Sequence, residues 1–286
     1  MSLVVVSEFM EEAALAPLHD AHQVIFDPSL VEDRSRLLEQ IEAASAVIVR
    51  NRTQIDQELL DAAPQLGVVG RLGVGLDNID MAACERRGVV VHPATGANAR
   101  AVAEYVVAST MMLFRGAYQA QARMVAGEWP RSELQGRETS GKTLGLIGLG
   151  GIARLVAERA IALGMKVSAH DPYLAADDPA WHEVKQANSL IDLLADADAI
   201  SLHIPLTDST RHLINADSLK TMRAGVVIVN TSRGGIIDDA ALAAALRRGE
   251  VAGAALEVFE TEPLTAAAGE LFADLDNVVL TPHIAG

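Results

Sequence analysis

The sequence predicts an α/β protein built from two wound parallel sheets, and three observations lead to this fold class. Short β-rich runs alternate with helical patterns along both halves of the 286-residue chain. Strands that alternate with helices of this length imply right-handed crossovers and therefore parallel pairing. Pro93 ends the first alternation, and a glycine-rich turn near residue 148 opens a second one. We therefore expect two domains, residues 1–96 and 97–283, with a cleft between them.

The first block contains five strand-like runs, at residues 3–9, 23–27, 46–50, 66–73 and 88–93. They are rich in β-branched residues, which is typical of strands. Helical patterns occupy the intervals at residues 11–19, 31–44, 56–64 and 78–88. This block is a complete βα unit, which explains why the glycine-rich turn comes only halfway along the chain.

A long helical stretch at residues 99–126 leads into the second block. Its apolar residues are too numerous for a lone exposed helix. We expect one side to pack on its own domain and another on a partner subunit in a homodimer; a purely intradomain helix is the alternative. Six strand-like runs follow, at residues 143–150, 166–171, 199–204, 225–232, 252–259 and 277–283.

Composition excludes several classes of protein. A net charge of −15 argues against nucleic acid as a partner. The chain has no apolar run of about 18 residues, so we expect no membrane span, and the acidic N-terminus does not look like a signal peptide. A single cysteine, Cys84, is typical of a reducing compartment, and we expect a cytoplasmic protein.

Two segments match phosphate-binding patterns. Residues 136–143, GRETSGKT, match the P-loop letters, but a strand-like run follows Lys142 where a P-loop needs a helix. Residues 148–153, GLGGIA, stand between a strand and a helix, which is the context of a dinucleotide site. Gly148 permits the tight turn and Gly150 lets the backbone approach a pyrophosphate. This motif predicts that the second domain is Rossmann-like.

Asp171 indicates which dinucleotide binds. It closes the strand-like run KVSAHD, 18 positions after Ala153. Its carboxylate can accept hydrogen bonds from an adenosine ribose and would repel a 2′-phosphate, and no arginine follows directly. We therefore expect NAD rather than NADP. No His/Cys spacing is typical of zinc, and we expect no metal.

Reactive side chains follow the strands of the second domain. Arg233, Glu262 and His283 come after three different strand-like runs, and ligands of wound sheets bind beyond the carboxyl ends of strands. Hydride addition to a ketone requires a proton donor, for which His283 is the candidate. Glu262 can keep the imidazole charged, and the planar fork of Arg233 can hold a carboxylate. The set predicts hydride transfer between nicotinamide and a 2-keto or 2-hydroxy acid.

Five ordered blocks carry a family resemblance: GLIGLGGIA…HDP, SLHIPLTDSTRHLIN, NTSRGGIIDDAAL, ALEVFETEPL and NVVLTPHIAG. Together they resemble the D-isomer-specific 2-hydroxyacid dehydrogenases, nearest to the 3-phosphoglycerate dehydrogenase group. The resemblance implies the same roles for the arginine, glutamate and histidine. It extends the NAD site to Gly151, Ile152, His203, Pro205, Thr231, Ser232 and Glu257. It places the substrate carboxylate on the backbone at Leu72, Gly73, Val74 and Gly75, and it assigns Asn98 to the domain junction.

Two features depart from the family pattern. Glu257 stands where the family commonly has aspartate near the nicotinamide carboxamide. Relatives also continue past the catalytic histidine with a helix that returns to the first domain. We expect residues 284–286 to begin such a segment.

Arginines of the first domain bear on the choice of acid. Arg50 and Arg71 match positions that face the substrate's phosphate in phosphoglycerate dehydrogenases. We therefore expect an anionic group on C3, as in 3-phosphoglycerate; sulfolactate, or a simple lactate- or glycerate-type acid, is the alternative. The alternative is that these arginines lie on the surface and pair with acidic residues of this negatively charged protein. A non-enzymatic NAD-sensing protein of the corepressor type is a rival from another class.

Overall fold

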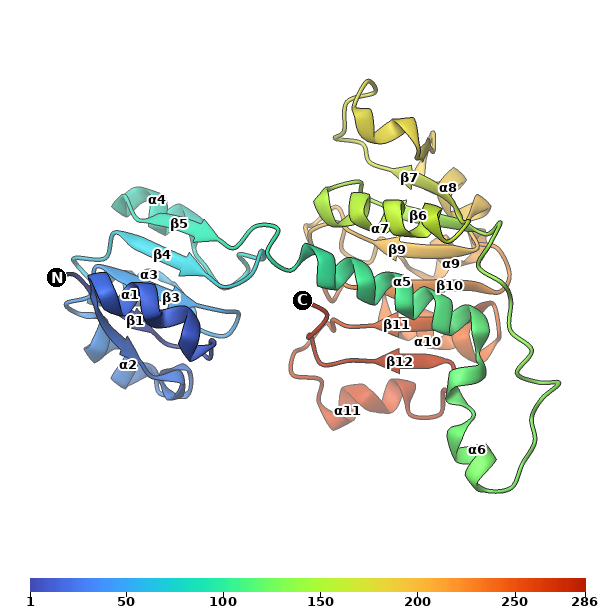
Figure 1. Cartoon of the computed structure of the whole chain (residues 1–286), viewed down its shortest axis with the longest axis horizontal. Coiled ribbons are helices and arrows are strands. Elements are labelled where there is room, and N and C mark those ends of the chain that lie inside the picture. The colour runs from blue at the N-terminus through green and yellow to red at the C-terminus, as the bar shows by residue number, and fades with distance from the viewer. The chain divides into compact units, whose positions relative to one another are not determined.

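The computed structural model describes residues 1–286, apart from the side chain of Gln119. It divides the chain into two compact units, Met1–Asn98 and Ala99–Gly286. Each unit contains one sheet, with five strands in the first and seven in the second. All recorded strand pairs are parallel, which confirms the predicted fold class (Figure 1).

Unit 1 has the strand order β2-β1-β3-β4-β5, in which the direction of winding reverses between β1 and β3. Its strands are β1 (Leu3–Val6), β2 (Gln23–Phe26), β3 (Ala46–Val49), β4 (Val68–Arg71) and β5 (Val90–Pro93). Its helices are α1 (Ala16–Ala21), α2 (Arg34–Ile41), α3 (Gln57–Ala62) and α4 (Met81–Arg87), with 3-10 turns η1 (Glu12–Leu15) and η2 (Pro28–Glu32). The order matches the flavodoxin-like winding.

Valines of the central strands form the core of unit 1. Val5, Val47 and Val69 are fully buried, each on a different strand. Burial of such a side chain contributes about 1.5–3 kcal/mol. Aspartates at positions 33, 56 and 80 begin α2, α3 and α4 by accepting backbone N–H bonds, so local sequence sets where these helices start.

Unit 2 has the strand order β12-β11-β10-β9-β6-β7-β8, which is the Rossmann winding with one added strand. Its strands are β6 (Thr143–Ile147), β7 (Lys166–His170), β8 (Lys185–Gln186), β9 (Ala199–Leu202), β10 (Val226–Asn230), β11 (Val251–Leu256) and β12 (Val278–Leu280). The winding reverses between β6 and β9, and wound sheets bind their ligands beyond the carboxyl ends of the strands at such a point.

Helices cover both faces of this sheet. They are α5 (Ala99–Arg115), α6 (Gln121–Val125), α7 (Gly151–Ala162), α8 (Leu190–Asp196), α9 (Ala216–Thr221), α10 (Asp239–Arg247) and α11 (Ala266–Gly269), with 3-10 turns η3 (Ala117–Gln119), η4 (Pro179–His182) and η5 (Glu270–Phe272). Helices α5 and α7 share one core layer, and α8, α9 and α10 share the other (Figure 1).

Two expectations about elements need correction, and one strand was missed. The helix expected at residues 99–126 ends at Arg115, because Gly116 takes a left-handed conformation (φ 63°) and redirects the chain into η3 and α6. Strand β1 stops at Val6, because Ser7 and Glu8 turn into side-chain contacts. Strand β8 was not expected, since two residues carry no periodicity.

Lys142 leads directly into β6, so the P-loop letters at 136–143 lack the helix that a P-loop requires.

Among the described residues, no helix is both long enough and apolar enough to pass through a membrane.

Candidate active site

The glycine turn joins β6 to α7. Gly148 has φ 86°, and a β-carbon there would lie 2.7 Å from the carbonyl oxygen of His203. Gly150 precedes α7 without a side-chain cap, and no atom lies within 4 Å of where its β-carbon would be. The backbone N–H groups at the start of α7 are therefore open to a bound anion. Gly151 and Ile152, also expected at the cofactor, form the first turn of this helix.

Asp171 stands directly behind the same turn. Its Oδ2 accepts a hydrogen bond from the N–H of Leu149 at 2.9 Å, and its Oδ1 accepts one from the N–H of Tyr173 at 3.0 Å. The carboxylate is thus held beside the glycine turn at the end of β7.

His203 follows β9 on the other side of the reversal point. Its Nε2 lies 2.9 Å from Ser201 Oγ, and its N–H donates to the carbonyl of Ile147 at 2.8 Å. Burial lowers the pKa of His203 to about 4, so the imidazole is neutral at pH 7. A neutral ring can line a cofactor site but is a poor proton donor. Pro205 lies two residues further along.

A tight turn after β10 presents Arg233. Asn230 holds this turn with its side chain, which accepts from the N–H of Ser232 at 3.0 Å and donates to the carbonyl of Arg233 at 3.0 Å. A β-carbon at Gly234 would overlap the Phe259 carbonyl, so the turn packs closely on the segment after β11. Thr231 Oγ1 is buried and has no hydrogen-bond partner among the described residues.

Glu262 and His283 form a direct pair. His283 Nδ1 lies 2.7 Å from Glu262 Oε2, and Glu262 Oε1 accepts from the N–H of Phe259 at 3.0 Å. The hydrogen bond from Glu262 raises the pKa of His283, against the opposing effect of burial. Burial alone would raise the pKa of Glu262, but the bonds from His283 and Phe259, with the attraction of Arg233, lower it overall. Arg233 therefore lies near enough to affect both groups.

Glu257 fixes the backbone around His283. His283 has φ 55°, which is uncommon for a residue with a β-carbon. Its N–H donates to the carbonyl of Glu257 at 3.1 Å, and the buried Glu257 Oε1 accepts from the N–H groups of Ile284 and of Ala285, the latter at 2.9 Å. Burial raises the pKa of Glu257, partly offset by these two bonds.

The substrate residues expected in unit 1 follow β3 and β4. Val49 and Arg71 are partners in the register of these strands, and the N–H of Leu72 donates to the carbonyl of Val49 at 2.8 Å. Arg71 folds back on its own turn, where Nη1 donates to the carbonyl of Leu72 at 2.9 Å. Gly73 (φ 140°) lies against this guanidinium, and Val74 and Gly75 continue the turn.

Arg50 and Arg52 differ in their partners. Within the described part of the chain, the exposed Arg50 guanidinium makes no hydrogen bond or ion pair. Arg52 Nη1 lies 2.7 Å from Glu32 Oε1, so its charge is matched. Asn98 ends unit 1 and has a buried Oδ1 without a partner among the described residues.

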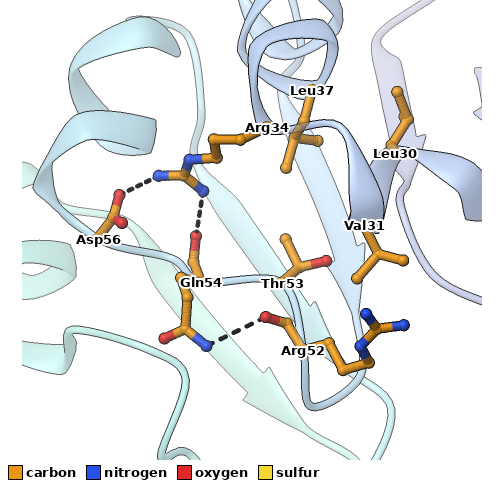
Figure 2. Close-up of a pocket in the computed structure, with 8 residues that line it drawn as sticks. All are labelled: Leu30, Val31, Arg34, Leu37, Arg52, Thr53, Gln54 and Asp56. Atoms are coloured by element: carbon orange, nitrogen blue, oxygen red, sulfur yellow. Dashed lines mark hydrogen bonds and ion pairs between the residues drawn. The ribbon is translucent and has the colours of Figure 1, made fainter.

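A pocket of about 160 Å³ lies under the Arg52 end of this segment (Figure 2). Arg34 crosses it and donates to the carbonyl of Gln54 at 2.8 Å and to the carboxylates of Asp56 and Glu58. Figure 2 shows Arg52 at the opposite end, where Gln54 donates to its carbonyl. The arginines that line this pocket are already neutralised, so we do not assign it a ligand.

Of the three strand-end residues of unit 2, the structure pairs Glu262 with His283 and places Arg233 near enough to affect the pKa of both. Asn230 and the Glu257 bonds to the backbone were missed. Asparagine at the end of a β-strand, directly before a turn, was the available signal for the first. Nothing local could reveal the second, because Glu257 and Ala285 are far apart in sequence.

Two family models match the chain. The catalytic domain of D-isomer specific 2-hydroxyacid dehydrogenase matches residues 4–176, and the NAD binding domain of the same family matches residues 107–285. Among curated proteins, (S)-sulfolactate dehydrogenase of Chromohalobacter salexigens is 54% identical over 286 residues, which cover 100% of this chain and 92% of that protein. D-3-phosphoglycerate dehydrogenase of Mycobacterium leprae is 42% identical over 284 residues, 99% of this chain but only 53% of that protein.

Two solved structures have a similar fold. The TT0316 protein of Thermus thermophilus has a TM-score of 0.89 and 34% identity, with 99% of this chain and 89% of that chain covered. D-lactate dehydrogenase of Aquifex aeolicus, complexed with NAD and lactic acid, has a TM-score of 0.85 and 29% identity, with the same two coverages.

Proposed function

The chain belongs to the D-isomer specific 2-hydroxyacid dehydrogenase family, whose members are NAD-dependent oxidoreductases, and we propose that its substrate is a 2-hydroxy acid with an anionic group on C3. Sulfolactate is the first candidate and 3-phosphoglycerate the second. The observation that carries the proposal is the unengaged guanidinium of Arg50, at the end of the strand next to the Arg71 turn. Similarity to a sulfolactate dehydrogenase over nearly its whole length favours a sulfonate over a phosphate.

In unit 1, Arg50 and Arg71 would hold the C3 anion. The backbone of Leu72–Gly75, together with Asn98, would hold the substrate carboxylate. Arginine suits sulfonate and phosphate because its planar fork offers several N–H donors in one plane. Arg52 plays no part in this proposal, since Glu32 already neutralises it.

In unit 2, His283 would exchange a proton with the substrate oxygen. Glu262 holds Nδ1, which leaves Nε2 as the nitrogen that donates. In the reductive direction C2 gains a hydride, and the carbonyl oxygen becomes a hydroxyl by taking the proton from Nε2. Arg233 would orient the substrate carboxylate and polarise the carbonyl. The raised pKa of His283 keeps this proton available near neutral pH.

Several features of unit 2 suit NAD. The open N-terminus of α7 and the space at Gly150 accommodate a pyrophosphate, and Asp171 accommodates a ribose. The orphaned Thr231 hydroxyl and the neighbouring Ser232 offer polar contacts. Both recorded bonds to the Glu257 carboxylate use Oε1, which leaves Oε2 for the carboxamide. When bound, NAD supplies or accepts the hydride.

We also propose a cytoplasmic homodimer formed around α5 and the segment that follows it. Four large apolar side chains are exposed within a dozen residues here: Tyr118, Met124, Val125 and Trp129. An exposed apolar patch of this kind favours a protein–protein contact. The buried free thiol of Cys84 is consistent with a reducing compartment.

The substrate assignment is tested by comparing kcat/KM for sulfolactate, 3-phosphoglycerate and lactate, with NADH formation followed by absorbance. We expect sulfolactate to be used best and lactate worst. The variant R50M should lose most of the preference for the anionic acids and retain activity with lactate. Equal kcat/KM values for all three acids would refute the anion-binding role.

A further inference from the structure

Glu8 is a buried carboxylate beneath the loop that carries Arg50. Only 5% of this residue is exposed. Its Oε1 accepts from the N–H of Arg50 at 2.8 Å and from the N–H of Thr53 at 2.9 Å. The N–H of Arg52 is shared between both oxygens, at 3.2 and 3.3 Å. Three backbone donors of the segment Arg50–Thr53 therefore converge on one side chain.

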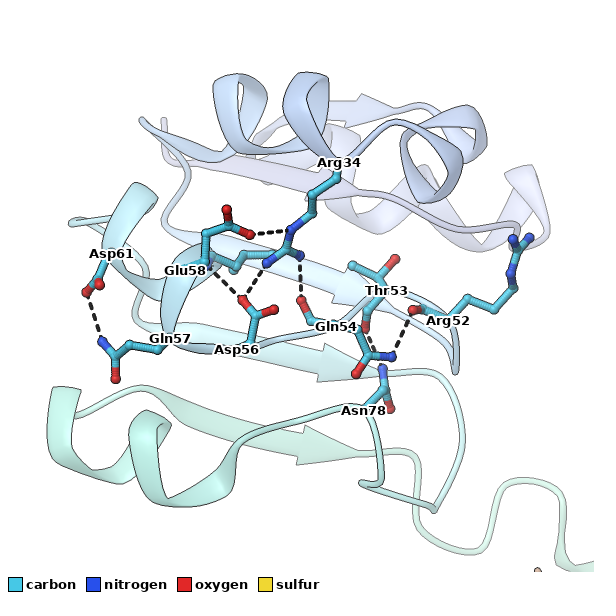
Figure 3. Close-up of polar contacts among 10 residues, drawn as sticks. Arg34, Arg52, Thr53, Gln54, Asp56, Gln57, Glu58, Asp61 and Asn78 are labelled. Atoms are coloured by element: carbon cyan, nitrogen blue, oxygen red, sulfur yellow. Dashed lines mark hydrogen bonds and ion pairs between the residues drawn. The ribbon is translucent and has the colours of Figure 1, made fainter. Parts of the chain in front are cut away.

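Asn78 binds backbone carbonyl groups of the same segment, whereas Glu8 binds its N–H groups. Its Nδ2 donates to the carbonyl of Thr53 at 2.7 Å and to the carbonyl of Arg50 at 3.2 Å. Figure 3 shows this contact with Thr53 beside the Arg52–Gln54 bond. Ser7 Oγ lies 3.0 Å from Thr53 Oγ1 and closes the frame. The backbone of the segment is thus held from both sides, while the Arg50 side chain stays exposed.

A buried carboxylate is an expensive way to support a loop. Its desolvation must be offset by hydrogen bonds, and an apolar residue of similar volume would often stabilise the fold as well. The three N–H bonds offset this cost and at the same time select one backbone geometry. Glu8 therefore fixes the backbone position from which the Arg50 side chain extends.

We propose that Glu8 is a positioning residue for substrate specificity: it fixes the Arg50 loop in the geometry that recognises the anionic group on C3. The inference rests on the proposed function, since it assigns Arg50 to that anion. Glu8 itself would not contact the substrate, because its carboxylate is occupied by the loop backbone.

The variant E8Q tests this role. Glutamine keeps the volume, but its amide oxygen is a weaker acceptor than a carboxylate, and its NH2 group would face the N–H of Arg52 in place of Oε2, so the loop would relax. We expect KM for sulfolactate to rise about tenfold, the effect of losing one charge-assisted hydrogen bond, with kcat and the KM for lactate nearly unchanged. Amide hydrogen exchange at residues 50, 52 and 53 should accelerate, and exchange within β1 and β3 should not. E11Q is the matched control, because Glu11 is exposed and has the same charge.

The possible outcomes separate the two proposals. A wild-type enzyme without preference for an anionic acid would overturn the proposed function and, with it, the role of Glu8. A wild-type preference that E8Q preserves would overturn the role of Glu8 alone. If E8Q does not fold, as judged by circular dichroism, E8D provides the test: the shorter side chain cannot reach all three donors, and the same selective loss is expected.

Discussion

At the scale of single residues, unit 2 contains two histidine–glutamate pairs with similar geometry and different surroundings. His212 Nε2 lies 2.7 Å from Glu260 Oε1, and the His283–Glu262 distance is the same. Both histidines also have positive φ. Around His283, Glu262 raises the pKa of the imidazole and Arg233 lies near enough to oppose this effect. The neighbourhood, rather than the pair itself, makes His283 the candidate acid.

Replacing His283 by alanine should lower kcat by about 10²–10⁴-fold, because the developing alkoxide loses its proton donor. NADH binding, followed by fluorescence titration, should be preserved. His212→Ala is the matched control and should keep near-normal turnover. Comparable kcat in H283A and wild type would remove His283 from the mechanism.

The pH dependence of activity follows from the same pair. Reduction needs the protonated imidazole, so its rate should be highest below the raised pKa of His283 and fall as pH rises through it; oxidation should show the opposite trend. In E262Q the main cause of the raised pKa is lost, so both inflections should move to lower pH. Profiles of kcat/KM in the two directions measure this shift. An inflection that stays in place in E262Q would contradict the pairing.

At the scale of elements, the β6–α7 turn contains two glycines, Gly148 and Gly150, whose surroundings differ. Gly148 has a left-handed φ and lies against the His203 carbonyl, so its constraint is imposed by the fold. Gly150 has an ordinary backbone conformation and open space around it, so no contact within the chain requires glycine there. Substitutions at the two glycines should therefore have different effects.

Gly148→Ala should destabilise the protein by about 1–3 kcal/mol, through strain and a close carbonyl contact. Gly150→Ala should leave the thermal midpoint unchanged but raise KM for NAD, since the added methyl group occupies the space assigned to the pyrophosphate. Differential scanning calorimetry and NAD titration distinguish the two variants. If G150A bound NAD as well as wild type, the turn would not be the pyrophosphate site.

The end of β7 should control the choice of dinucleotide. Asp171→Ala removes a negative charge at the proposed ribose site, so the preference for NAD over NADP should fall by about tenfold or more. The preference is measured as the ratio of kcat/KM values for the two cofactors. Asp177→Ala, an exposed acidic neighbour, is the control and should leave the ratio as it is. An unchanged ratio in D171A would withdraw this assignment.

At the scale of the whole molecule, the two units have separate cores and separate tasks. Buried side chains group within each sheet and its own helices. In the proposed function, unit 1 supplies the cationic groups for the anion, and unit 2 supplies the His283–Glu262 pair and the glycine turn. The segment that follows α5 belongs to neither core, since Val125 is 83% exposed and Trp129 is 75% exposed.

Trp129→Ser combined with Val125→Ser should convert the proposed dimer into a monomer, because the apolar contact area would be lost. Sedimentation velocity over a range of concentrations measures the change. Tyr173→Ser removes another exposed aromatic of unit 2, outside this segment, and should sediment as wild type does. Wild-type protein that is monomeric at every concentration would rule out the dimer.

What the sequence alone determined follows from short-range chemistry. The alternation of β-rich runs and helical patterns predicted both sheets, because the periodicity of a segment acts locally. Spacing along the chain was also enough to associate Asp171 with the glycine turn. Arg233, Glu262 and His283 could be chosen because carboxyl ends of parallel strands share one edge of a sheet.

Tertiary structure decided the remaining features, because they depend on contacts between residues far apart in sequence. The short edge strand β8, the pairing of Nδ1 of His283 with Glu262, and the backbone bonds of Glu257 have no local signature. Glu8 is the clearest case. In the sequence it is one acid among many near the N-terminus, and only folding brings its carboxylate beneath Arg50, 42 positions away.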